Sequence, residues 1–218
     1  MRVPAGPKST AYLPNATETL GGADGWTTPF IVQDVDTVTG LLGIELYRFS
    51  DGALAMTRDV RSIAPGTSYA CSPQAEAALP GETQYSVVIR AYLIDAIAVV
   101  NEHAGSGMTL QPAAYVGATR GATSVSLPNA TKRFFGFVAP FIIQNLGTAA
   151  TTATASLVSF DGTRHAVTVT TSQPLAVAVN THGYAAPRRA PIPSPADPWS
   201  TRRTGSPRGR RPCSCRTS

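Results

Sequence analysis

Short stretches rich in Val, Ile, Thr and aromatic residues follow one another along the first hundred positions, separated by Gly, Pro, Asp and Asn. This pattern predicts strands at residues 10–14, 28–35, 41–49, 54–63, 67–71, 83–92 and 95–102. The alternation is clearest where Tyr85, Val87 and Ile89 share one face, which predicts a strand with one buried face. No stretch keeps a 3.6-residue period, so little helix is expected. Seven short strands are typical of a β-sandwich.

The same pattern returns later in the chain. Residues 29–34 (PFIVQD) recur 111 positions later as 140–145 (PFIIQN), and LPNAT at 13–17 recurs unchanged at 127–131. Asp51-Gly52, which suits a tight hairpin turn with a positive φ, recurs as Asp161-Gly162. A nearly constant offset over several motifs predicts a tandem repeat of one supersecondary unit.

The second unit is shorter than the first. Asp51 and Ile97 are 46 positions apart, whereas the corresponding Asp161 and Ala176 are 15 apart, so about 31 residues are missing. The missing piece corresponds to two or three strands, and its loss exposes apolar faces and strand edges. We therefore expect a second unit that is less stable or depends on the first.

These observations divide the chain into four parts. They are a first β-sandwich at 10–104, a partly ordered linker at 105–122, a truncated second β-sandwich at 123–184, and a disordered tail at 185–218. The linker carries apolar residues among its glycines, so we expect Thr109 to Val116 to form an added edge strand of the first unit. The free hinge is then 117–121.

The charge lies mainly in the tail. The 218 residues carry a net charge of +5, but residues 187–218 hold eight Arg and one Asp, which leaves residues 1–186 at −2. With few large apolar residues, the tail is expected to be disordered. Its Arg, Pro, Ser and Gly resemble a GC-rich frame translated out of register, which we favour over a nucleic-acid-binding arm.

The sequence shows neither a membrane span nor a secretory signal. No run of eighteen apolar residues is present, so no membrane span is expected. Residues 1–8 lack the apolar region of a secretory signal. The sequence is therefore expected to be either cytosolic or a piece of a longer protein.

Motifs of enzymes are missing from the sequence: no nucleophile elbow, zinc-protease helix, dinucleotide loop or phosphate loop is found. We therefore expect no enzymatic activity and no cofactor. His103 and His182 occupy matching positions in the two units, and strand-end caps are favoured over an acid-base or ligand role. Of the three cysteines, Cys71 is expected to pack as a small apolar residue.

Two weak candidate sites remain. Asp34 and Asp36, with Asp24 nearby, offer oxygen ligands for calcium. The second unit has Asn145 and Gly147 at the positions of the first two, so solvated loop charges are favoured. Trp26 is the candidate for stacking on a sugar, but Phe137 replaces it in the second unit, which favours core packing.

Two repeated polar positions have structural interpretations. Gln33 and Gln144 lie inside matching apolar strands, and each is expected to be buried and to hold a neighbouring loop through its amide. Asn15 and Asn129 satisfy the glycosylation sequon, but we interpret them as turn residues of the repeated Leu-Pro-Asn motif.

Taken as a set, these motifs resemble a known family. Leu-Pro-Asn, Thr-Pro-Phe-Ile-Val-Gln-Asp, the Asp-Gly hairpin, Ile-Ala-Pro-Gly and Ala-Val-Val-Asn-Glu are similar to the tandem immunoglobulin-like β-sandwich repeats of secreted and surface-attached bacterial proteins, notably of Chloroflexi-type bacteria. The resemblance covers 10–104 fully and 123–183 in part. It implies an extracellular or cell-surface location and brings no catalytic residues with it.

The resulting hypothesis is a non-enzymatic surface module, a spacer or an adhesion domain, from a longer protein. Its expected partner is a protein or polysaccharide at the cell surface, its expected state is monomeric, and nucleic acid is not expected. The alternative is a carbohydrate-binding accessory region of a secreted hydrolase.

Overall fold

The computed structural model describes residues 6–22, 24–105, 110–128, 130, 132–134, 137–138, 141–147, 149–171 and 177–179. These residues form strands and their connections, with one three-residue 3-10 helix, η1 at Pro73–Ala75. The part of the chain that is described contains no helix long and apolar enough to cross a membrane. The structure is therefore all-β, as the sequence pattern predicts.

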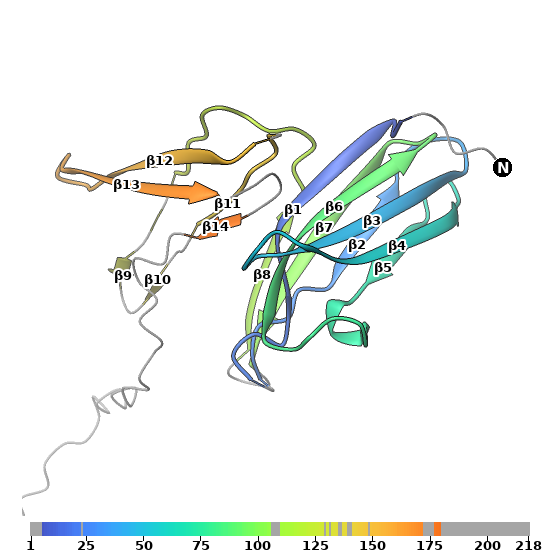
Figure 1. Ribbon diagram of the computed structural model, residues 1–218, viewed down its shortest axis with the longest axis horizontal. Helices are drawn as coiled ribbons and strands as arrows, with labels where there is room; N and C mark the ends of the chain where they lie inside the picture. The colour runs from blue at the N-terminus through green and yellow to red at the C-terminus, as the bar shows by residue number, and fades with distance from the viewer. Residues whose placement is uncertain are drawn as a thin grey trace, which may run out of the picture. The chain divides into compact units, whose positions relative to one another are not determined.

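Eight strands make up the first part of the chain (Figure 1). They are β1 Ser9–Glu18, β2 Phe30–Asp34, β3 Gly40–Arg48, β4 Leu54–Ile63, β5 Ser68–Cys71, β6 Thr83–Tyr92, β7 Ala96–Ala104 and β8 Gln111–Val116. All seven strands predicted from residues 10–102 are present, and β1 continues four residues beyond its predicted end.

The eight strands form two antiparallel sheets around one core. One sheet has the order β1-β6-β3-β4 and the other β5-β2-β7-β8. Leu13, Leu46 and Val87 from the first sheet share a buried cluster with Phe30 and Val100 from the second. Burying side chains of this size contributes about 1.5–3 kcal/mol each, so this cluster is the main source of stability. We call residues 6–118 the first sandwich.

Strand β6 departs from the predicted pattern. Tyr85, Val87 and Ile89 are buried as expected, but Ser86 and Val88 on the opposite face are buried as well. Because β6 pairs with both β1 and β3, large side chains stand on either side of its outer face: Val88 is in register with Tyr12 and Glu45. The prediction that only one face of this strand is buried is therefore wrong.

The predicted added edge strand is present as β8, which pairs with β7 from Val99↔Val116 to Ala104↔Gln111. Directly after β8 the chain crosses to the other sheet, where Ala118 exchanges two backbone hydrogen bonds with Tyr12. Gly117 stands at the crossing, and a Cβ there would lie 2.7 Å from a methyl carbon of the buried Leu13. Only glycine fits this close approach without displacing the core.

Later residues form smaller pieces of sheet. They contain β9 Lys132–Phe134, β10 Phe137–Val138, β11 Ile142–Gln144, β12 Thr151–Val158, β13 Arg164–Thr171 and β14 Val177–Val179. The described strands pair as β9-β10, β11-β14 and β12-β13, all antiparallel. We call residues 123–179 the second unit. The predicted disordered tail at 185–218 lies outside the described residues.

Local geometry recurs between the first sandwich and the second unit. Gly52 and Gly162 have φ of 67° and 83°, as predicted for the two hairpin turns. Asp51 Oδ1 accepts a hydrogen bond from the Ala53 N–H at 3.0 Å, and Asp161 Oδ1 accepts one from Thr163 at 2.9 Å. These turns join β3 to β4 and β12 to β13, so the two hairpins are equivalent in position and in detail.

The pairing of β2 with β7 also has a counterpart, with a small shift. Gln33 is in register with Ile97, and Gln144 is in register with Val177. In the sequence alignment Ile97 corresponds to Ala176, so the expected partner of Gln144 is Ala176, and the observed partner Val177 is one residue further along. A shift of one residue along a strand exchanges its two faces.

Candidate functional site

The outer face of the β5-β2-β7-β8 sheet carries an apolar row. Ala70, Ile31, Val99 and Val116 are consecutive partners across the four strands. Their inward neighbours fill the core, so the strand alternation points these side chains outward. Ile31 is 40% exposed and Val116 67%. Exposed apolar rows of this kind are typical of contact surfaces for other macromolecules.

Beside this row, strands β7 and β8 frame an open hollow of about 550 Å³. It is lined by Asn101, Glu102, His103, Leu110, Pro112, Ala113 and Ala114. The polar side chains come from β7, and the apolar ones come from β8 and from Leu110 just before it. Such an open surface suits contact with a side chain of a partner better than enclosure of a small molecule.

His103 lies in β7 and is tied to the segment before β2. Its backbone exchanges two hydrogen bonds with Thr27, and its Nε2 lies 2.9 Å from Thr27 Oγ1. The ring therefore joins two neighbouring segments close to the end of its strand, which agrees with the predicted structural role. Its predicted counterpart His182 lies outside the described residues.

Tyr115 on β8 holds the two sheets together at one edge. Its hydroxyl donates to the Asn15 carbonyl at 2.5 Å and accepts from the Asn15 N–H at 3.1 Å. The register of β1 shifts between Leu13 and Ala16, so Asn15 lies in a bulge whose backbone groups need other partners. Burial raises the pKa of the Tyr115 hydroxyl, which stays protonated and able to donate.

Asn15 therefore lies in a strand, and the prediction that it is a turn residue is wrong. Its Nδ2 donates to Glu102 Oε1 at 2.7 Å, and its Oδ1 accepts from Gln84 Nε2 at 3.3 Å. The side chain links β1 to both β6 and β7, so it has a structural role. The equivalent Asn129 lies outside the described residues.

The calcium candidates are separated by the fold. Asp34 points into the core and is fully buried, which contradicts the interpretation as a solvated loop charge. Asp36 is paired with Lys8, which donates a hydrogen bond to Asp36 Oδ2. This bond lowers the pKa of Asp36 to about 2. Among the described residues, no three His, Cys, Asp or Glu side chains gather closely enough to hold a metal ion.

Asp34 has a local role that the second unit repeats. Its Oδ1 accepts the Asp36 N–H at 2.8 Å, and Asn145 Oδ1 accepts the Gly147 N–H at 2.9 Å. Asn145 also donates from Nδ2 to the Ala149 carbonyl at 2.7 Å, whereas Asp34 Oδ2 is buried without a hydrogen-bond partner. The two positions therefore share one turn, and the amide satisfies it more completely.

The repeated glutamines differ in their partners. Gln33 Nε2 donates to the Gly66 carbonyl at 3.4 Å, so it holds a neighbouring loop as predicted, although it is only half-buried. Gln144 has both amide atoms buried and without hydrogen-bond partners. The prediction that the glutamine amide holds a neighbouring loop is therefore confirmed for Gln33 and wrong for Gln144.

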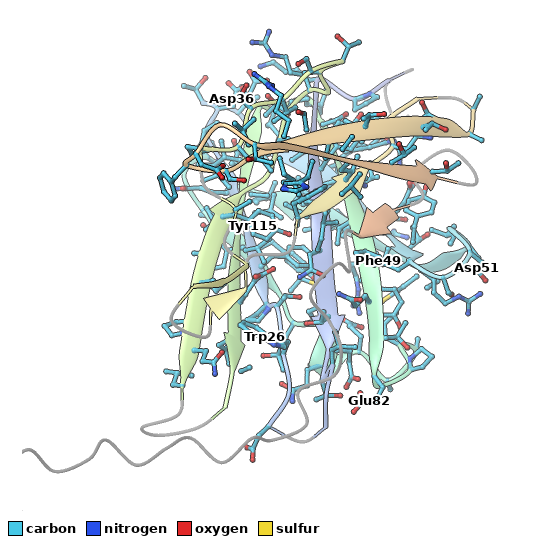
Figure 2. The ribbon with its side chains drawn as sticks, turned by 90° about the vertical axis from the view of Figure 1, so that its left-hand side faces the viewer. Trp26, Asp36, Phe49, Asp51, Glu82 and Tyr115 are labelled. Carbon is cyan, nitrogen blue, oxygen red and sulfur yellow. The ribbon has the colours of Figure 1, made fainter. Side chains whose placement is uncertain are left out.

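Trp26 is half-buried and is not part of the core cluster, so its predicted core packing is wrong. The backbone explains its position: Trp26 and Leu20 exchange two hydrogen bonds that close the loop between them. In that loop the N–H groups of Gly21 and Gly22 donate to the Glu82 carboxylate at 2.8 and 2.6 Å. Figure 2 shows Glu82 at the end of the sandwich opposite Asp36.

Cys71 is buried in the core cluster, as predicted for a small apolar residue. Burial raises the pKa of its thiol to about 11. A thiol that stays protonated at neutral pH is a poor nucleophile. This residue therefore serves packing.

Two of these polar contacts are not predicted by the sequence pattern. The Tyr115–Asn15 bonds join residues 100 positions apart, and no local pattern connects them. The contact of Glu82 with Gly21 and Gly22 likewise depends on the folded arrangement of two turns. The glycine pair itself was the available signal, since consecutive glycines favour a loop whose N–H groups point to one side.

Comparison with known proteins adds little. No family model matches the chain, and no curated protein is similar to it in sequence. Among solved structures, the crystal structure of Thermotoga maritima 1070 is similar with a TM-score of 0.42 and 12% identity, over 51% of this chain and 94% of that one. The Anabaena sensory rhodopsin transducer is similar with a TM-score of 0.34 and 10% identity, over 42% of this chain and 93% of that one.

Proposed function

We propose that this chain consists of two tandem immunoglobulin-like β-sandwich repeats, the second incomplete, and that it is a piece of a non-enzymatic extracellular or cell-surface protein. In this proposal the repeats act as spacers or as adhesion modules. The partner is a protein or polysaccharide at the cell surface.

One observation carries the proposal: turn geometry recurs at matching positions of the two copies. The Asp51 and Asp161 turns and the Asp34 and Asn145 turns use the same hydrogen bonds in both units. Proteins that repeat one structural unit in series gain length and surface, which suits a spacer. An active site that occurs once has no need of such repetition.

The exposed row of Ile31, Val99 and Val116 supports the adhesion part of the proposal. The row spans the whole sheet, and the hollow next to it offers the exposed Asn101 for polar contacts. Interfaces commonly combine an apolar centre with a polar rim.

Surface accessibility tests this function. An antibody raised against the first sandwich is applied to intact and to lysed cells that produce the protein. Equal labelling of both samples, removed by external protease, is the expected result. Labelling that requires lysis would contradict a surface location.

A carbohydrate-binding module is the second candidate, because Trp26 is half-buried and lies outside the core. A partly exposed indole is able to stack on a sugar ring. Retention of the protein on insoluble polysaccharide that disappears with Trp26→Ala would favour this function. Retention that persists in Trp26→Ala, or no retention at all, would exclude Trp26 as the sugar platform.

A further inference from the structure

Strand β2 of the first sandwich is covered on both sides. It pairs with β7 along one edge and with β5 along the other, where Gln33 is in register with Ser68. The turn that leads into β5 provides the Gly66 carbonyl that accepts from Gln33 Nε2. Both the strand edge and the glutamine amide are therefore satisfied by the segment 66–71.

Strand β11 of the second unit is the counterpart of β2, but it is covered on one side. It pairs with β14, and among the described residues no strand is hydrogen-bonded to its other edge. Gln144 stands where Gln33 stands in the first copy, and its Nε2 and Oε1 are buried without partners. A buried amide without partners is unfavourable, so this position calls for a backbone segment beside it.

The sequence explains why the segment is missing. Between Asp161 and β14 the chain is about 30 residues shorter than between Asp51 and the equivalent part of β7. The lost stretch contains the counterparts of the turn at Gly66 and of strand β5. The second unit thus keeps the acceptor strand and the glutamine, while the polypeptide that satisfies both in the first copy has no equivalent.

We infer that the open edge of β11 accepts an extended strand from another polypeptide. The strand takes the place of β5: its backbone pairs along Ile142–Gln144, and a carbonyl just before it accepts from Gln144 Nε2. In β5, Tyr69 and Cys71 pack toward the core while Ser68 and Ala70 face outward. The incoming strand needs the same alternation of apolar and small or polar residues.

Addition of a strand to an open sheet edge is a common way in which proteins bind extended segments, with affinity from the main chain and specificity from alternate side chains. The inference rests on the equivalence of the two repeats in the proposed function, but not on a surface location. It gives the proposed module a specific means of joining to another chain.

The experiment uses the full chain and a fluorescein-labelled synthetic peptide of residues 63–72, which spans the Gly66 turn and β5, with Cys71→Ser to prevent oxidation. Fluorescence anisotropy measures binding, and hydrogen exchange follows Ile142–Gln144. We expect saturable binding, with slower exchange of these amides in the complex. A peptide that carries Tyr69→Pro in addition is expected to bind at least tenfold more weakly, because proline interrupts the backbone pairing.

Matched protein variants locate the site. Gln144→Leu removes the amide and is expected to weaken peptide binding about threefold to tenfold, the effect of one hydrogen bond. Gln33→Leu is the control and is expected to leave binding unchanged, because β5 of the same chain already fills that edge. The comparison of the two peptides on the unaltered protein stands even if one variant folds poorly.

Several results would overturn the inference. Equal binding of the proline peptide would show that no strand is added, and equal loss in both glutamine variants would place the peptide elsewhere. Slow exchange of Ile142–Gln144 in the free chain at every protein concentration would show that this chain already fills the edge itself. None of these results bears on the antibody test of surface location.

Discussion

The first sandwich and the second unit differ most in how their strands are joined. In the first sandwich, β6 connects β1 to β3, and β5 covers one edge of β2. In the second unit, the described strands form three separate pairs. Under the proposed repeat, the gap in the sequence alignment falls on the counterparts of β5 and β6, which are the strand that completes one sheet and the strand that joins the other.

The difference teaches that the strands of one sandwich contribute unequally to holding its sheets together. β6 is buried on both faces and pairs along nearly its whole length with two neighbours. An edge strand such as β4 is charged and half-exposed, and it is paired on one side only. Loss of a central strand therefore divides a sheet, whereas the hairpin turns that lie outside the gap keep their geometry.

The largest expected effect comes from equivalent phenylalanines. Phe30 is fully buried in the first sandwich, and its counterpart Phe141 is half-buried. Phe30→Ala is expected to reduce the free energy of unfolding by about 3–5 kcal/mol, the usual cost of emptying a core site of this size. Phe141→Ala is expected to cost no more than about 2 kcal/mol, because part of its ring already meets water. Denaturant unfolding measures both losses. Equal losses in the free energy of unfolding would contradict the difference between the first sandwich and the second unit.

The next effect concerns the closed edge of the first sandwich. Tyr115→Phe keeps the ring and removes the hydroxyl that pairs with both backbone groups of Asn15. We expect a loss of about 1–3 kcal/mol, because the bulge is left without these partners. Gel filtration and hydrogen exchange of β8 accompany the measurement. As a control, Tyr12→Phe is expected to change stability little. An unchanged unfolding midpoint for Tyr115→Phe would mean that β8 contributes little to the first sandwich.

A smaller effect is expected when one copy is made to resemble the other. Asp34→Asn gives the first sandwich the residue found at Asn145 and keeps the oxygen that accepts the Asp36 N–H. Because Asp34 Oδ2 is buried without a partner, replacing the carboxylate by an amide is expected to stabilise the sandwich by about 1–2 kcal/mol. The reverse change, Asn145→Asp, is expected to destabilise the second unit. Destabilisation by Asp34→Asn would show that the carboxylate has a partner of its own.

The smallest effect is a dependence on pH that arises from an ion pair of the first sandwich. The bond from Lys8 lowers the pKa of Asp36 from 3.8 to about 2. Because the pKa is depressed in the folded state, the stabilisation is present above about pH 4 and is lost as the pH falls through about 2. Asp36→Asn should therefore lower the Tm slightly at pH 6 and not at pH 2. Lys8→Met removes the contacts of Lys8 with both Asp36 and Asp95, so it should lower the Tm at pH 6 at least as much. A Tm difference between Asp36→Asn and the unaltered protein that persists at pH 2 would rule out this ion pair as its cause.

Much of the fold of the first sandwich could be predicted from its sequence. Strand positions, the Asp51-Gly52 turn and the added strand β8 follow from local alternation and turn residues. Side-chain environments were harder: Asp34 is buried because strand alternation continues to the last residue of β2. Trp26 lies outside the core because the Leu20–Trp26 pairing ends the loop there. Both outcomes depend on where a strand begins or ends, which composition does not determine.

The candidate site was less predictable than the fold. The pairing of Ile31 with Val99, and of Val99 with Val116, arises from strands far apart in sequence. The open edge of β11 is an exception, because the deletion and the repeated glutamine are both visible in the sequence. Its significance depends on the observation that Gln33 is satisfied by the Gly66 turn and Gln144 is not.

Separate expression of residues 6–118 and 119–184 tests the central claim most directly, since that claim is that a complete set of strands stabilises the first sandwich and not the second unit. Each fragment is unfolded in guanidinium chloride and followed by circular dichroism. We expect a single cooperative transition for 6–118, because its two four-stranded sheets close around one core. We expect no cooperative transition for 119–184. A cooperative transition of the isolated second fragment would contradict the account.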